Sequence, residues 1–175
     1  MDKILEVRGL SKVYGAGCSF CFERTGPEFE SNICPHCGTV VAAHDVSFDL
    51  YKGEILGIMG ESGSGKSTAV KTLYFDQAPT SGRAVFFDHF NNSDRLNDQA
   101  RIISLFDLNV AQQRQLANQR CGMVYQNPNL GLNFDISAGG NIAERLLMSN
   151  VHHFADIRAR ATQLLKRTEV MTERM

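Results

Sequence analysis

The chain has 175 residues, of which 43% are hydrophobic and 21% are charged, and its formal net charge is −1. This length and composition suit one globular domain with room for a small insert. The near-zero charge gives no general attraction to nucleic acid or anionic lipid, so we expect no nucleic acid partner. No apolar run approaches the roughly 20 residues that span a bilayer, and the N-terminus lacks a signal-peptide core, so we expect a cytoplasmic protein.

The first part of the chain predicts two strands separated by an insert. Ile4 to Val7 alternates with polar neighbours as a half-exposed strand does, and Gly9 is expected to close that strand. Val46 to Leu50 predicts the second strand. Residues 16–40 interrupt this β pattern with cysteines, prolines and glycines, so we interpret them as an insert.

Two C-x-x-C pairs lie in the insert: Cys18, Cys21, Cys34 and Cys37. In a reducing cytosol, such cysteines are better explained as metal ligands than as disulfides. Two such turns can make a closed Cys₄ site, so we predict a structural Zn²⁺ ion there; an iron–sulfur cluster and unmetallated thiols are the alternatives. His36 is interpreted as a solvent-facing spacer, and Cys121 as a small buried apolar residue.

A nine-residue segment, GESGSGKST, fits the phosphate-binding loop pattern G-x-x-x-x-G-K-[ST]. The predicted nucleotide-binding residues of this loop are Gly60, Glu61, Ser62, Gly63, Ser64, Gly65, Lys66, Ser67 and Thr68. Backbone N–H groups of such a loop face a phosphate chain, Lys66 supplies a charge for the β- and γ-phosphates, and the Ser67 hydroxyl can ligate Mg²⁺. An apolar run over residues 54–59 predicts a strand before the loop, and residues 67–74 predict a helix after it. The sequence therefore predicts a nucleoside triphosphate site.

The rest of the chain predicts a mixture of strands and helices. Arg83 to Phe87 predicts a strand, Asp88 to Gln99 a polar surface excursion, and Cys121 to Tyr125 a buried strand. Three helices are expected over residues 109–119, 141–148 and 156–168.

The strand predicted at residues 121–125 runs directly into Gln126, Asn127 and Pro128. A phosphate loop, a spacer with strands, and an apolar strand ending in glutamine resemble the ATP-binding cassette (ABC) ATPases. The resemblance implies that Gln126 contacts Mg²⁺ and the attacking water, and that Tyr14, in the segment Leu-Ser-Lys-Val-Tyr, stacks on the adenine; an ordinary surface aromatic is the alternative for Tyr14. Lys66 and Gln126 are then the predicted catalytic residues, and a second ABC ATPase subunit is the implied partner.

The same resemblance implies an α/β fold, the P-loop NTPase fold of the ABC ATPase type. It implies that residues 1–175 are a truncated ABC ATPase domain, with an N-terminal antiparallel β subdomain and the start of a helical subdomain at residues 127–175. The Cys₄ insert at residues 16–40 lies outside the resemblance. Residues 137–146 and 153–161 look like the ATP-binding subunit of bacterial carbon–phosphorus lyase systems, which degrade phosphonates. That likeness implies lyase core subunits as partners. The chain is also similar to dipeptide and oligopeptide importer ATPases, whose partners are membrane permease subunits.

The family's signature loop, Asp-Glu strand and switch histidine are expected about where this sequence stops. Residues 84–88 form an apolar run ending in an acid and could substitute for the Asp-Glu strand, but we interpret them as an edge strand entering a turn. Asp107 is an equally weak substitute for that strand. We therefore expect the chain to be the N-terminal part of a longer ATPase, able to bind ATP but not to hydrolyse it efficiently. A nucleotide- and zinc-binding module without turnover is the third hypothesis, beside the two ATPase subunits.

Overall fold

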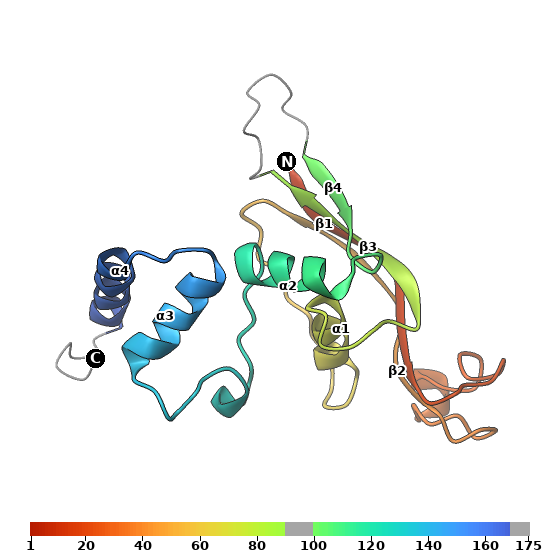
Figure 1. Ribbon diagram of the computed structural model, residues 1–175. Coiled ribbons are helices and arrows are strands. Elements are labelled where there is room, and N and C mark those ends of the chain that lie inside the picture. The colour runs from red at the N-terminus through yellow and green to blue at the C-terminus, as the bar shows by residue number, and fades with distance from the viewer. Residues whose placement is uncertain (90–99, 169–175) are drawn as a thin grey trace. The chain divides into compact units, whose positions relative to one another are not determined.

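The computed structural model describes residues 1–89 and 100–168. The chain divides into two compact units, Met1–Asn109 and Val110–Met175, and each unit is described by itself. Figure 1 labels the helices and strands of both units. Nearly all of the predicted polar excursion at residues 88–99 lies outside the described residues.

The first unit is built on a four-stranded antiparallel sheet with the strand order β2-β1-β3-β4. The strands are β1 (Lys3–Tyr14), β2 (Val40–Tyr51), β3 (Ser81–Asp88) and β4 (Arg101–Ser104). Helix α1 (Lys66–Leu73) packs against β1 and β2. Val7, Leu10 and Ala84 are fully buried, so the core of this unit lies where β1 and β3 pair. The antiparallel sheet confirms the N-terminal β subdomain of the predicted fold.

Two details of the sheet correct the sequence interpretation. Gly9 does not close the first strand: the register of β1 against β2 shifts between Val7 and Leu10, and Gly9 has a φ of 61°, so a bulge carries the strand on to Tyr14. β3 is not an edge strand, because β4 pairs with its outer side. The buried Asp88 therefore ends an inner strand, opposite Arg101.

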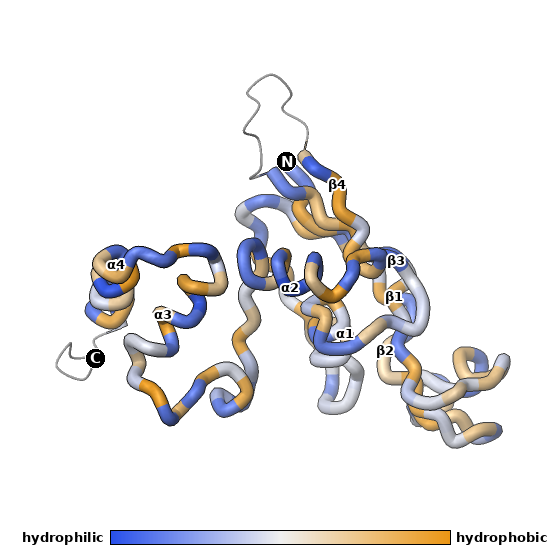
Figure 2. The backbone as a smooth tube through the Cα atoms, viewed as in Figure 1, coloured by the Kyte–Doolittle hydropathy of each residue, from blue (hydrophilic) through white to orange (hydrophobic). Residues whose placement is uncertain are grey.

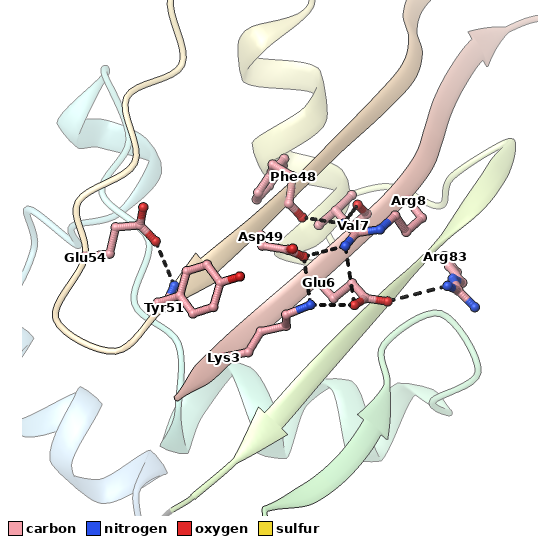
Figure 3. A network of polar contacts seen from close by, with 9 residues as sticks. All are labelled: Lys3, Glu6, Val7, Arg8, Phe48, Asp49, Tyr51, Glu54 and Arg83. Carbon is pink, nitrogen blue, oxygen red and sulfur yellow. Dashed lines mark hydrogen bonds and ion pairs between the residues drawn. The ribbon is translucent and has the colours of Figure 1, made fainter. Parts of the chain in front are cut away.

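A cluster of charged side chains joins β1, β2 and β3 (Figure 3). The ammonium group of Lys3 lies 2.8 Å from a carboxylate oxygen of Glu6 and 3.2 Å from one of Asp49. Arg8 donates to Asp49 over 2.7 Å, and Arg83 reaches Glu6 at 3.5 Å. The two carboxylates are thus surrounded by three cations, and the arrangement fixes the side chains on this face of the sheet.

Over residues 110–168, the second unit contains three α-helices: α2 (Val110–Gln119), α3 (Ala138–Met148) and α4 (Phe154–Arg167). They confirm the three helices predicted there. The backbone N–H of Gly140 donates a 3.1 Å hydrogen bond to the Ser137 hydroxyl, which caps the start of α3. Ile157, Ala161 and Leu165 are the buried residues of α4, four positions apart as an amphipathic helix requires. In Figure 2, α4 contains both hydrophobic and hydrophilic residues.

Two predicted strands are absent, at residues 54–59 and at residues 121–125. The side chains of Ile55, Met59 and Val124 are 97%, 94% and 95% exposed. A buried parallel strand reads as an apolar run, but a strand forms only where a neighbour completes its hydrogen-bond ladder. Among the described residues, the four sheet strands pair with one another and leave no partner for these two segments. Cys121 is accordingly half-exposed, which corrects its prediction as a buried residue.

Short 3₁₀ turns lie at Pro27–Phe29 in the insert and at Pro128–Leu130 in the second unit. Within the described ranges, no helix combines the length and apolar character that a membrane span needs.

Candidate functional site

The phosphate-binding loop lies in the first unit and ends where α1 begins. Its backbone depends on glycine at Gly65, the residue before the helix, which has a φ of 86°. A Cβ atom added there would lie 1.8 Å from the carbonyl oxygen of Ala42, far inside the closest distance of non-bonded atoms, so a larger residue would clash with the backbone. No side chain caps α1 at Gly65, so the helix starts with N–H groups that no cap occupies. The loop thus offers an anion the backbone donors and the positive end of a helix dipole.

Lys66 folds back over the loop that precedes it. Its ammonium group donates to the backbone carbonyl oxygens of Gly60, at 2.8 Å, and Glu61, and to the hydroxyl of Ser64 at 3.2 Å. A flexible cation held by two carbonyl oxygens and a hydroxyl can exchange those acceptors for phosphate oxygens without moving far. The next residue, Ser67, is exposed, so its hydroxyl is accessible to a ligand in the loop. These positions fit a bound nucleoside triphosphate with its Mg²⁺ ion.

Tyr14 ends β1 and is 47% exposed, as a residue that stacks on a ligand must be. Its hydroxyl donates a 2.6 Å hydrogen bond to Oε1 of Gln77. Through Nε2, Gln77 donates to the carbonyl oxygen of Thr68 at 2.9 Å and contacts the Thr72 hydroxyl at 3.0 Å. The ammonium group of Lys12 lies 5.3 Å from the centre of the Tyr14 ring. The aromatic residue is therefore tied to the helix that carries the phosphate loop.

Sequence reasoning missed Gln77, and no local pattern marks it. It is 63 residues from Tyr14 and joins that residue to α1 by side-chain bonds alone. Only the pairing of the sheet and the packing of α1 bring these positions together.

Gln126 belongs to the second unit, where it is exposed in a bend. The following residues form an ordered turn, since the side chain of Asn127 accepts a 3.0 Å hydrogen bond from the N–H of Asn129. Gln126 is described within the second unit, whereas the phosphate loop belongs to the first. The predicted contact of Gln126 with Mg²⁺ and water therefore stays a prediction.

The four cysteines of the insert come together in the first unit. Their sulfur atoms all lie within 4.8 Å of one another. Cys21 and Cys34 are buried, with Val13 and Val41 beside them, while Cys37 is exposed. Burial raises the pKa of the Cys18 thiol to about 12, whereas the Thr39 hydroxyl lowers the pKa of Cys37 to about 6. The donor set is the one a tetrahedral metal ion takes, and His36 stays exposed outside it, as expected.

With this geometry established, comparison with known proteins identifies the family. The sequence profile described as "ABC transporter" matches residues 43–174. The chain belongs to the ABC transporter family.

Curated relatives agree with this assignment. The chain is 40% identical over 131 residues to the "Putative phosphonates utilization ATP-binding protein PhnK" of Escherichia coli K12, a match that covers 75% of the chain and 46% of PhnK. It is 33% identical over 118 residues to the oligopeptide transport ATP-binding protein OppF of Bacillus subtilis, covering 67% of the chain and 33% of OppF. It is 32% identical over 144 residues to the dipeptide transport ATP-binding protein DppD of Lactococcus lactis, covering 79% of the chain and 37% of that protein. The chain thus spans less than half the length of these relatives.

Solved structures give the fold. The ATP-binding cassette MJ0796, solved as a dimer bound to ADP and Pi, superposes with a TM-score of 0.69 at 22% sequence identity. The superposition covers 98% of this chain and 60% of that cassette. The predicted ABC ATPase fold, covering part of the domain, is therefore confirmed.

Proposed function

We propose that this chain is the nucleotide-binding part of an ATPase subunit that powers a carbon–phosphorus lyase system for phosphonate use. The observation that carries the proposal is the 40% identity to PhnK, against 32–34% for the peptide-transport relatives. Because the chain spans 46% of PhnK, the activity and partners of the whole protein are part of this proposal.

In the proposed site, ATP lies on the phosphate loop and Tyr14 stacks on its adenine. Lys66 leaves its carbonyl acceptors in the loop and binds the β- and γ-phosphates, while the N–H groups at the start of α1 hold the phosphate chain. The hydroxyl of Ser67 is the ligand offered to Mg²⁺. When bound there, Mg²⁺ would neutralise negative charge on the triphosphate.

Gln126 has a separate proposed role, in orienting the water that attacks the γ-phosphate. An amide side chain suits this task because it donates from nitrogen and accepts at oxygen at the same time. The Gly131 to Asn133 region after it is exposed, as Gln126 itself is.

The proposed partners are a second ABC ATPase subunit and the core subunits of the lyase. The proposal implies a cytoplasmic protein, because ATP and the soluble lyase substrates are present there. No role in nucleic acid binding is proposed.

A second candidate function is the ATPase subunit of a dipeptide or oligopeptide importer, with membrane permeases as partners. The 33% identity to OppF and 32% identity to DppD support it. The nucleotide site is the same in both functions, so the phosphate loop does not separate them.

Growth on defined phosphorus sources separates the two functions. A Lys66→Ala change at the native gene should abolish growth on a phosphonate as the sole phosphorus source and leave growth on inorganic phosphate intact. Lys71→Ala, five residues further along α1, is the control and should grow on both. Normal growth of Lys66→Ala on the phosphonate, together with a loss of peptide uptake, would support the importer and exclude the lyase role.

A further inference from the structure

The cysteine insert is not explained by nucleotide binding, and the ABC transporter profile begins after it, at residue 43. Its four cysteines lie between the end of β1 and the start of β2. In Figure 1 the insert lies at the far end of the β1–β2 pair from the N-terminus. It is therefore a separate feature at one end of the sheet.

The spacing of the sulfur atoms fits one metal ion. Cys18 Sγ lies 3.7 Å from the sulfur atoms of both Cys21 and Cys34, and Cys21 Sγ lies 3.4 Å from that of Cys37. Zinc–sulfur bonds of about 2.3 Å in a tetrahedron place the sulfurs about 3.8 Å apart. A disulfide would need about 2.05 Å. A cluster of several irons would hold its cysteine sulfurs further apart, because iron and sulfide ions lie between them.

Backbone hydrogen bonds hold each pair of cysteines in a tight turn. The N–H of Cys21 donates to the carbonyl oxygen of Cys18 at 3.2 Å, and the N–H of Gly38 donates to that of Cys34 at 2.8 Å. Gly38 has a φ of 73°, the conformation that such a turn requires after its second cysteine. The four thiols are thus placed by their own loops, so a metal ion would find the ligands already assembled.

The insert also lacks an apolar core of its own. Its buried cluster consists of Cys21 and Cys34 with Val13 of β1 and Val41 of β2, and Cys18 packs against it. A stretch of this size cannot bury enough surface to fold alone, and metals commonly supply the missing stability in such units. The aromatic side chains of Phe20 and Phe29 do not form such a core, because they are 43% and 44% exposed.

We propose that Cys18, Cys21, Cys34 and Cys37 bind one Zn²⁺ ion in a closed tetrahedral site that fastens the insert to the ends of β1 and β2. Four thiolates leave no open position, so the ion is structural. The hydroxyl of Thr39, which accepts a 3.3 Å hydrogen bond from the N–H of Gly17, links the turn of the second pair to the segment after β1. Zinc binding therefore sets the conformation of the chain that follows Tyr14.

Metal analysis of the purified chain, prepared without added metal, tests the proposal. We expect one zinc ion per chain, lost in a Cys34→Ser/Cys37→Ser variant. Cys121→Ser removes the one cysteine outside the cluster and should keep the zinc. Iron in place of zinc, with colour in the visible spectrum, would overturn the proposal, as would zinc retained by the double variant.

Cobalt binding keeps the test decisive if the double variant fails to fold. The reduced, metal-free wild-type chain should bind one Co²⁺ ion, with the strong visible bands of a tetrahedral site and thiolate-to-cobalt charge transfer in the near ultraviolet. Added zinc should remove these bands and raise the thermal unfolding midpoint of the chain. Weak bands typical of octahedral cobalt, or no binding at all, would contradict a closed Cys₄ site.

Discussion

Tyr14 at the end of β1 and Gln77 beyond α1 are joined by a 2.6 Å hydrogen bond from the tyrosine hydroxyl. Because Gln77 also donates to the carbonyl oxygen of Thr68 on α1, the orientation of the tyrosine ring depends on the helix that carries the phosphate loop. The proposed adenine contact and the phosphate contact are thereby fixed relative to each other.

This bond gives the first prediction. Tyr14→Ala should weaken ATP binding by the worth of one base–aromatic stack, on the order of 1–3 kcal/mol. Tyr14→Phe and Gln77→Leu keep the aromatic ring but remove its hydrogen bond to residue 77. Each variant should therefore lose less affinity for ATP than Tyr14→Ala does. Calorimetric titration with ATP and with inorganic triphosphate checks this, since triphosphate binding should not change. Equal ATP affinity for Tyr14→Ala and wild type would show that the ring does not contact the base.

The second prediction concerns Gly65. Gly65→Ala should destabilise the first unit by at least about 2 kcal/mol, because an alanine at positive φ is strained and its Cβ would collide with the Ala42 backbone. Denaturant unfolding measures the loss. Gly57→Ala is the matched control: a Cβ there meets nothing within 4 Å, so its stability should match the wild type. A normal midpoint for Gly65→Ala would mean that the loop adopts another conformation in solution.

How much of the site could be read from the sequence depends on the range of each contact. The phosphate loop is local in the chain, so its pattern at Gly60 to Thr68 predicted the loop and the helix that follows it. The paired spacing of the cysteines likewise predicted that they gather. Gln77 could not be predicted, because its partners Tyr14 and Thr68 come close only after the sheet and helix pack.

The errors in the fold have physical causes of the same kind. A glycine after alternating residues usually ends a strand, but Gly9 sits in a bulge whose partner strand β2 begins only at Val40. The apolar runs at residues 54–59 and 121–125 have the composition of buried strands, yet strand formation depends on neighbours that composition does not reveal. β4 has four residues, too few for alternation to mark it.

The third prediction concerns acid stability. The hydrogen bond from Lys3 lowers the pKa of Glu6 below its ordinary 4.5. Burial opposes the shift at Asp49, but Arg8 and Lys3 still lower its pKa below the ordinary 3.8. The pKa values of both carboxyl groups are thus lower in the folded protein than in the unfolded chain. Both carboxylates therefore stabilise the fold at pH values above their ordinary pKa. This contribution is lost as the pH falls through the lowered pKa values of the folded protein.

Thermal unfolding of the wild type from pH 6 to pH 3 should therefore show a steep loss below about pH 4.5. Glu6→Gln should be less stable than wild type at pH 6, and the difference should shrink toward pH 3. Glu54→Gln, which alters an exposed carboxylate outside this cluster, should follow the wild-type profile. A constant difference between Glu6→Gln and wild type across this range would show that Glu6 does not act through its charge.

We propose that the chain binds Mg-nucleotide through the phosphate loop and that Lys66 binds the phosphates. Lys66→Ala removes the cation that the structure holds across the loop. A charge-assisted hydrogen bond contributes roughly 1.5–3 kcal/mol, so affinity for Mg-ATP should fall by about ten- to hundredfold. Lys71→Ala changes a lysine in the last turn of the same helix and should bind as the wild type does.

The direct measurement is calorimetric titration of the wild-type chain, Lys66→Ala and Lys71→Ala with Mg-ATP under one buffer and salt condition. We predict saturable binding by the wild type and Lys71→Ala, and a large loss of affinity in Lys66→Ala. Equal binding by all three proteins, or no binding by a folded wild-type chain, would contradict the assignment of this loop as the nucleotide site.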